Sequence, residues 1–454
     1  MPFTKLQFKP GINREPTSYT NEGSWFDCNL IRFKFGFPEK IGGWSKYSSE
    51  TFLGSCRSLH NWVALDGSNY MGLGTHLKFY IEEGGQYNDV TPLRSTTSAG
   101  DVTFSATNGS ATITVSDTSH GAVLNDFVTF SGAATLGGNI TATILNAEHQ
   151  ITNIVDADSY EIVASVSANA SDTGNGGSSV VGKYQINVGL DTTVGGTGWG
   201  AGTYGRGTWG SAASSSVTTV IRLWSQDNFG EDLIFNARDG AIYYWDKSNT
   251  LSTRGVEIGS LGGASNTPTV ATQVLVSDRD KHVIAFGTNP QGSSTQDPLL
   301  VRFSDQADAA NWTASATTTA GDLRVGSGSR IIKAVETKRE ILILTDTSLH
   351  SMRFIGAPFT FGLSELSKGI TVMGPNAITA VNDNVIWMGQ DGFYSYGGQL
   401  SQLPCPIKDK SFGDFNTSQF DKVFAGVNSA FSEVFWFYPS SSSDDNDKYV
   451  VFNY

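Results

Sequence analysis

Histidine and aspartate are the side chains of this sequence best suited to holding a metal ion. The six histidines are scattered, with no HExxH motif and no pair four residues apart: His60, His76, His120, His149, His282 and His350. Metal ligation needs neighbouring ligands, so lone imidazoles are interpreted as ordinary surface or core residues. The stretch Asp444, Asp445 and Asp447 lacks the ligand positions and turning glycine of calcium loops, which favours a solvated hairpin tip. We expect no metal site.

Paired carboxylates would indicate glycoside hydrolysis. The SxDxGxxW turn of sialidase-type enzymes is approached most closely by Ser304, Asp305 and Trp312, where the glycine is missing and the spacing is wrong. Three further aspartates occupy turn or strand-edge positions, where aspartate commonly hydrogen-bonds its own backbone: Asp232, Asp239 and Asp391. No acid–base pair stands out, and no GxSxG elbow is present. The sequence predicts no catalytic residues and no enzyme.

A glycine-rich stretch, residues 195–210, raises the question of phosphate binding. The GxxxxGK[ST] motif is absent, and no helix start follows that would aim amide groups at an anion. Trp199, Tyr204 and Trp209 recur at intervals of five residues, each followed by glycine. We interpret the stretch as a contact with a neighbouring subunit or with the inserted segment described below, and expect no cofactor. Its aromatics could also stack on sugars, which keeps glycan binding open as an alternative.

The composition favours turn-rich β-structure and excludes several classes of function. The 454 residues include 51 glycines, only 16% are charged, and 11% are aromatic. A net charge of −13 argues against a broad, sequence-independent grip on nucleic acid. Cys28, Cys56 and Cys405 lie far apart, which suits reduced thiols in a protein folded in the cytoplasm. Residues 1–10 lack a signal-peptide core and no apolar run is long enough to span a membrane, so we expect a soluble protein.

A unit of two apolar strands joined by a short turn recurs along the chain. Six copies are found: 70–73 with 77–81, 233–235 with 242–245, 283–286 with 299–303, 341–344 with 349–354, 385–388 with 393–396, and 434–438 with 449–452. The last five recur at roughly 45 to 60 residues, close to the period of propeller blades. Flanking segments such as 377–381 and 399–403 supply further strands. The sequence predicts an all-β propeller of about six four-stranded blades.

The repeat is interrupted by residues 96–182, which are rich in Ser, Thr, Ala and Gly and contain no Trp. The segment shows six short alternating runs: 102–104, 111–115, 127–130, 140–145, 150–155 and 159–163. It is bounded by polar stretches, 95–100 and 165–179, that resemble linkers. We predict three parts: propeller with the first blade in 1–95, an inserted β-sandwich or barrel domain in 96–182, and the remaining blades in 183–454.

The sixth copy ends at Tyr454, before a fourth strand could form. Two explanations remain open. The N-terminal segment 3–8 could complete that sheet and close the ring, or the natural chain could be longer.

Several phrases of the sequence resemble the tail nozzle proteins of short-tailed bacteriophages (podoviruses), also called packaged-DNA stabilisation or tail accessory proteins. They run from GSWFDCNLIRFKFGFPEKIGGW through the glycine–aromatic stretch to the phrases that follow: 23–44, 199–210, 301–313, 320–330, 344–349, 387–394 and 403–406. Each phrase is short, but their collinear order covers essentially the whole chain outside the insertion.

The resemblance implies a hexameric ring of propellers at the distal end of a virion tail, assembled in the host cytoplasm. Such a ring docks on the adaptor below the portal, carries fibres or spikes, and closes the channel until DNA leaves. Its contact with double-stranded DNA would be transient and non-specific, and an acidic channel wall would keep it so by repulsion. Two alternatives stay open: a propeller that binds or cleaves host glycans, and an adhesin-like scaffold module.

Overall fold

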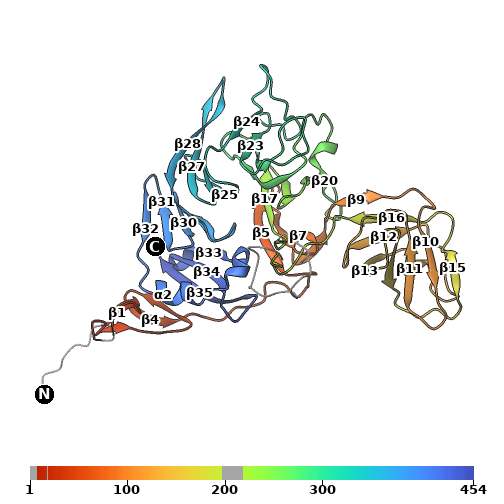
Figure 1. The fold of residues 1–454 in the computed structure, drawn as a ribbon, viewed down its shortest axis with the longest axis horizontal. Coiled ribbons are helices and arrows are strands. Elements are labelled where there is room, and N and C mark those ends of the chain that lie inside the picture. Colours follow the sequence, from red (N-terminus) through yellow and green to blue (C-terminus); the bar gives the residue numbers. More distant parts are fainter. Residues whose placement is uncertain (1–7, 18, 197–217) are drawn as a thin grey trace, which may run out of the picture. The chain divides into compact units, whose positions relative to one another are not determined.

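The computed structural model describes residues 8–17, 19–196 and 218–454, and these form an all-β propeller with an inserted β-sheet, as predicted (Figure 1). The chain divides into two compact units. One consists of Met1–Ser49, Thr192–Ile221 and Pro268–Tyr454, and the other of Glu50–Asp191 and Arg222–Thr267. Helical segments among the described residues are short: α1 (Ala142–Leu145), α2 (Lys408–Gly413), η1 (Ile258–Ser260), η2 (Thr417–Lys422) and η3 (Ser429–Phe431).

The first unit holds four blade sheets, each an antiparallel meander of consecutive strands. The first sheet comprises β21 (Ala271–Val276), β22 (Val283–Thr288), β23 (Leu300–Phe303) and β24 (Gly321–Arg324). The second comprises β25 (Ile331–Glu336), β26 (Ile341–Thr345), β27 (Ser348–Gly356) and β28 (Thr360–Lys368). The third comprises β29 (Ile378–Val381), β30 (Asn384–Met388), β31 (Phe393–Tyr396) and β32 (Leu400–Leu403). The fourth comprises three strands, β33 (Phe424–Asn428), β34 (Glu433–Pro439) and β35 (Asn446–Asn453).

The second unit holds two four-stranded blades of the same topology. One comprises β5 (Cys56–Val63), β6 (Asn69–Thr75), β7 (Phe79–Glu83) and β8 (Gln86–Asp89). The other comprises β17 (Trp224–Phe229), β18 (Asp232–Ala237), β19 (Ile242–Trp245) and β20 (Val256–Glu257). All six copies of the predicted strand pair are therefore present as the middle strands of blades or, in the last sheet, as its second and third strands.

Aromatic side chains and glycines together bring the two blades of the second unit into close contact. Phe79 of β7 stacks on Phe235 of β18 with ring centroids 4.1 Å apart. The indole N–H of Trp224 donates to the backbone oxygen of Thr75 at 2.7 Å, so the ring crosses from β17 to β6. A Cβ atom at Gly74 would lie 2.4 Å from the Trp224 ring, which is why this strand position requires glycine. Each blade thus buries an apolar face that it cannot cover alone.

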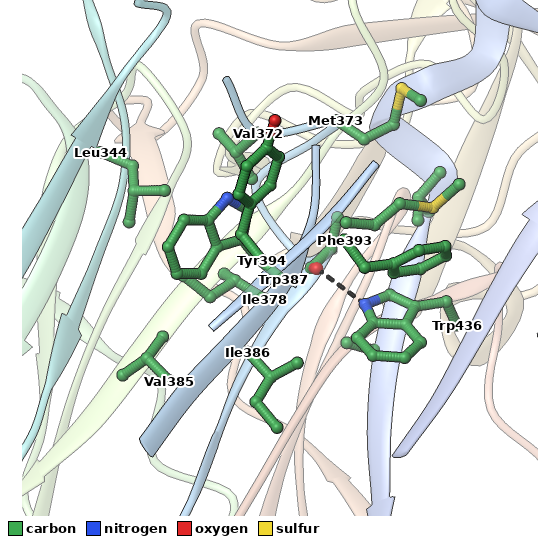
Figure 2. Close-up of a cluster of buried hydrophobic side chains, with 14 of the residues drawn as sticks. Leu344, Val372, Met373, Ile378, Val385, Ile386, Trp387, Phe393, Tyr394 and Trp436 are labelled. Carbon is green, nitrogen blue, oxygen red and sulfur yellow. Dashed lines mark hydrogen bonds between the residues drawn. The ribbon is translucent and has the colours of Figure 1, made fainter. Parts of the chain in front are cut away.

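In the first unit, the side chains of three successive blades form one buried cluster (Figure 2). Leu344 comes from the second sheet, Trp387 from the third and Trp436 from the fourth. The indole N–H of Trp436 donates to the oxygen of Ala377 at 3.0 Å, so even the polar atom of this buried ring is satisfied. β26 and β30 are apolar and buried at nearly every position, so both faces of these strands lie against other side chains.

The insertion folds as one eight-stranded sheet in the order β15-β10-β11-β14-β13-β12-β16-β9. The strands are β9 (Leu93–Thr96), β10 (Thr103–Ala106), β11 (Thr112–Ser116), β12 (Phe127–Ser131), β13 (Glu148–Ile154), β14 (Ser159–Val163), β15 (Asp172–Asn175) and β16 (Val181–Gln185). Phe104 of β10 packs edge-on against Phe130 of β12, with centroids 4.9 Å apart. These strands lie four places apart in the sheet, so the sheet curls around its own core. Whether it folds independently stays a prediction.

Two details of the predicted insertion are wrong. Residues 140–145 do not form a strand: α1 begins there because Thr141 caps the helix, accepting the N–H of Ile144 at 3.4 Å. The two polar stretches are not simple linkers either. Segment 95–100 contains the end of β9, and segment 165–179 contains β15, both paired into the sheet. These two strands are rich in small or polar residues and show no apolar pattern in the sequence. They are strands because their backbones pair with neighbouring strands.

An N-terminal arm, residues 8–49, belongs to the first unit and contains two small sheets. Strands β1 (Lys9–Ile12) and β2 (Ser24–Trp25) pair in parallel, while β3 (Ile31–Lys34) and β4 (Phe37–Lys40) form a hairpin. The proposed closing strand 3–8 lies outside the described residues except for Phe8. The arm is attached to the fourth sheet by Arg32, which pairs with Glu433 at 3.1 Å and lies over the Phe431 ring.

Candidate functional site

His282 illustrates how the histidines are used. It lies buried against Phe303, Phe354 and Phe361, with its Nε2 atom 3.1 Å from the Thr319 hydroxyl. Burial lowers the pKa of His282, since the charged form would lose hydration. Over the described residues, no group of three or more His, Cys, Asp and Glu side chains is arranged to hold a metal ion.

A Ser–His–Glu cluster in the second sheet of the first unit was not predicted from sequence. The Nε2 atom of His350 lies 2.9 Å from the Ser348 hydroxyl and 3.2 Å from the Ser327 hydroxyl. Ser327 in turn donates to Glu365 at 2.5 Å. A hydrolytic triad needs its carboxylate on the other ring nitrogen, whereas Glu365 accepts from Ser327, and Ser348 is fully buried. These hydrogen bonds connect the segment before β25 to β27 and β28.

Two carboxylates of the acidic segment at the β34–β35 connection, Asp445 and Asp447, are bonded to other side chains and backbone groups of the same chain. Lys422, whose side chain is almost completely buried, donates to Asp445 at 2.7 Å. Asp447 accepts both the backbone N–H and the hydroxyl of Ser440, each at 2.7 Å. These carboxylates act as turn and ion-pair acceptors.

The aspartates considered for sugar chemistry lie in loops, in turns or at a strand end. Asp305 accepts the backbone N–H and hydroxyl of Thr319 and the N–H of Gln306, all within one loop. Trp312 is 1% exposed and donates its indole N–H to the Ala309 oxygen at 2.9 Å. Asp232 at the start of β18 and Asp239 in the β18–β19 turn belong to the second unit, and Asp391 before β31 belongs to the third sheet of the first unit.

Residues 197–210 of the glycine–aromatic stretch, which include Trp199, Tyr204 and Trp209, lie outside the described residues. Its proposed contacts stay predictions.

A cavity of about 550 Å³ lies in the first unit, at the ends of the first two blade sheets. Its apolar walls include Met352, Phe354 and Phe361. Both signs of charge border it: Asp278, Arg279, Asp280, Glu336, Lys338 and Arg339. An aromatic floor with a charged rim can hold a polar ligand that has one apolar face.

Glu340 lines this cavity and is nearly buried, and its carboxylate accepts hydrogen bonds from three side chains. It accepts from Ser351, from Arg353 at 2.9 Å and from the Tyr396 hydroxyl at 3.2 Å. Burial alone would raise the pKa of Glu340, but these hydrogen bonds and the Arg353 charge outweigh it and lower the pKa. Ionised Glu340 therefore connects the second and third sheets by hydrogen bonds, because Ser351 and Arg353 belong to the second sheet and Tyr396 belongs to the third.

A buried charge network joins the inserted sheet to the blades of the second unit. The Nζ atom of Lys78, whose side chain is 3% exposed, donates to Asp89 at 2.8 Å and to Glu148 of the insertion. Arg254 approaches the same two carboxylates at 3.4 and 3.5 Å. Gln185 of β16 donates to Glu148 at 2.6 Å. This network could not be predicted from the sequence, because its residues lie far apart in the chain and form no motif.

The N-terminal arm exposes large aromatic side chains. Phe35 is 90% exposed, Trp44 86%, Tyr47 78% and Phe37 75%. We call these four residues the aromatic arm surface. They lie in or beside segment 23–44, whose sequence resembles nozzle proteins, and none of them supports a blade core.

No protein-family model matches the chain, and neither does any curated protein. Among solved structures, it is similar to the phage phi92 endosialidase at 10% identity, covering 92% of this chain and 56% of that chain, with a TM-score of 0.22. It is also similar to PorZ, a type-IX secretion component of Porphyromonas gingivalis, at 9% identity, 93% and 49% coverage and a TM-score of 0.33. The chain thus spans about half the length of these two proteins.

The sheets of this chain themselves define its class, a β-propeller with an inserted sheet. Among the described residues, no helix is both long and apolar enough to cross a membrane.

Proposed function

We propose that this chain is a structural protein of a virion: a nozzle subunit at the distal end of a short bacteriophage tail. Six copies form a ring around the DNA channel, dock on the adaptor below the portal and carry fibres or spikes. The ring closes the channel until DNA leaves and acts without catalytic residues or cofactor. Assembly takes place in the host cytoplasm, and contact with the double-stranded genome is transient.

The observation that carries this proposal is the aromatic arm surface. Phe35, Phe37 and Trp44 are each at least 75% exposed, although the chain buries Trp245, Trp312 and other large rings completely. A soluble monomer rarely keeps so many large apolar side chains in water on one short segment, whereas an assembly subunit covers them with a neighbour. The sequence resemblance to tail nozzle proteins is the reason for proposing a tail nozzle as that assembly.

Two further features agree with a mechanical role. The Ser–His–Glu cluster, the acidic loop and Glu340 are all used to connect strands and sheets, as a rigid ring requires. The net charge of −13 suits a conduit that must release DNA, because phosphates are repelled and not bound. That acidic residues line the channel is part of the proposal, and a ring with a strongly basic inner wall would contradict it.

The test is the mass of purified full-length protein with and without its tail adaptor, measured by mass photometry and negative-stain imaging. We expect closed rings of six 48.6 kDa chains when the adaptor is present. A protein that remains a monomer with the adaptor would overturn the nozzle assignment.

A second candidate function, binding or cleaving host glycans, is favoured by the cavity beside Phe354. Its aromatic floor could stack on a sugar and Arg279 could pair with an acidic substituent. A glycan array and a hydrolase assay test it, with Phe354→Ser and Trp209→Ala as the variants. Binding above background that is lost in Phe354→Ser would support this function, whereas the nozzle proposal expects no signal.

A further inference from the structure

We propose that the N-terminal arm of one copy docks on the β13–β14 hairpin of the inserted sheet in a neighbouring copy. This inference rests on the proposed function and names the contact that links the subunits of the ring. The occupant of the aromatic arm surface is thus a second copy of this chain.

The turn of the β3–β4 hairpin supplies the first reason. Lys34 pairs with Phe37, so Phe35 and Gly36 form a two-residue loop with φ values of +51° and +84°. Such loops favour asparagine followed by glycine, because residues with a bulky side chain pay a steric penalty at positive φ. Phenylalanine at this position does not help the hairpin, and 90% of its surface is in water. Its large ring at the tip is explained by a partner that covers it.

Charge supplies the second reason and indicates which surface is the partner. The arm, residues 8–49, contains six Lys and Arg against four Asp and Glu, a net charge of +2 in a chain of −13. Residues 96–182 contain eight Asp and Glu and not one Lys or Arg, a net charge of −8. The most acidic segment and the basic arm are therefore electrostatically complementary, which steers association and suppresses other pairings.

The β13–β14 hairpin combines this acidity with exposed apolar groups. At its turn, Val155 is 51% exposed beside the exposed carboxylates of Asp156 and Asp158. Along β14 the outward positions are Glu161 and Val163, the latter 52% exposed, while Tyr160 and Ile162 point into the core. This surface offers apolar contacts for the rings of the arm and carboxylates for Lys34 and Lys40.

The arm and the hairpin are different surfaces, so the contact is heterologous, with each copy giving its arm to the next. A heterologous contact closes into a ring when its rotation divides the circle, which is the arrangement that a tail nozzle requires.

The first experiment maps the contact in the assembled full-length particle. A photoreactive phenylalanine analogue replaces Phe37, and two differently mass-labelled copies are mixed before assembly on the adaptor. We expect cross-links from Phe37 to residues 148–163 that join one label to the other. Cross-links confined to the adaptor, or to another part of the chain, would overturn the inference.

The second experiment measures the concentration at which rings form. Phe35→Asn removes the ring and suits the positive φ of the turn, so we expect the variant to fold. We expect this variant and the pair Asp156→Lys with Asp158→Lys each to raise the half-assembly concentration by about 10-fold or more, as loss of a small interface contact would. Adding Lys34→Glu to the lysine pair should recover part of the loss. Leu65→Asn, at a turn residue 93% exposed in a blade of the second unit, is the matched control and should change nothing.

The outcomes separate the two proposals. Rings that form at unchanged concentration in both variants overturn the arm–hairpin contact and leave the nozzle assignment intact. Failure of the unmodified chain to form rings on its adaptor overturns the nozzle assignment itself.

Discussion

The N-terminal arm and the inserted sheet use aromatic side chains in opposite ways. In the insertion, Phe104, Phe130 and Tyr160 are all at most 1% exposed and fill a closed core. In the arm, Phe35 and Trp44 remain 90% and 86% exposed. Both regions are small β-structures of the same chain, so residue type alone does not explain the difference.

The contrast separates two roles for apolar surface. A ring buried within its own sheet contributes to folding, so its removal is felt in the unfolding free energy. An exposed ring contributes little to folding and can contribute to association instead. The predictions below test this division, beginning with the substitution expected to cost most.

Phe104→Ala should destabilise the protein by about 3–5 kcal/mol, because it removes a fully buried ring and leaves a cavity beside Phe130. Urea unfolding followed by far-UV circular dichroism measures the loss. The matched control is Val163→Ala on the outward side of β14, which should cost less than about 0.5 kcal/mol. Equal losses at the two sites would mean that the curled sheet has no closed core.

Lys78→Met should lower the free energy of unfolding by about 2 kcal/mol, because it leaves Asp89 and Glu148 without the buried cation that they share. The loss is smaller than for a fully buried ion pair, since both carboxylates are partly exposed. Calorimetry should show the insertion and the blades melting less cooperatively. Lys183→Met, at an exposed lysine of β16, is the control and should melt like the unmodified chain. A cooperative, unshifted transition in Lys78→Met would contradict the role given to this network.

The same network predicts a pH dependence. Burial would raise the pKa of Asp89, but the charges of Arg254 and Lys78 outweigh it and lower the pKa. A carboxyl whose pKa is lower in the folded state stabilises the protein above its unfolded value and loses this contribution as pH falls through the folded pKa. The unmodified chain should therefore lose stability below about pH 4, and Lys78→Met should show a shallower loss.

The blades were predictable from sequence and the surfaces were not. Strands such as β18 and β30 are short apolar runs, buried at nearly every position, and each carries an aromatic residue, so their assignment as strands follows from local pattern. Strand β15 has the sequence DTGN and no apolar signal, and only its partner β10 makes it a strand. The exposure of Phe35 was also hidden, because a phenylalanine in an aromatic-rich run is ordinarily assigned to a core. Both outcomes depend on which parts of the folded chain lie against each residue, and a single sequence does not show this.

Tyr184→Phe should cost about 1 kcal/mol, an intermediate effect within the buried core of the insertion. The Tyr184 hydroxyl donates to the nearly buried Asp117 at 2.6 Å and lies 2.8 Å from the Tyr160 hydroxyl. Its removal leaves a buried carboxylate without this donor. Tyr160→Phe leaves the Tyr184–Asp117 bond in place and should cost less, as urea unfolding of both variants would show. The reverse order would mean that Asp117 depends on Tyr160.

Phe35→Asn should have the smallest effect on stability, and the expected sign is favourable. Asparagine accepts positive φ more readily than phenylalanine, so the β3–β4 hairpin should gain a few tenths of a kcal/mol. Urea unfolding of the monomer, below the concentration of assembly, measures this without interference from neighbours. A loss above about 1 kcal/mol would show that Phe35 supports the fold of its own chain. The exposed rings of the arm and the buried rings of the insertion would then play the same role.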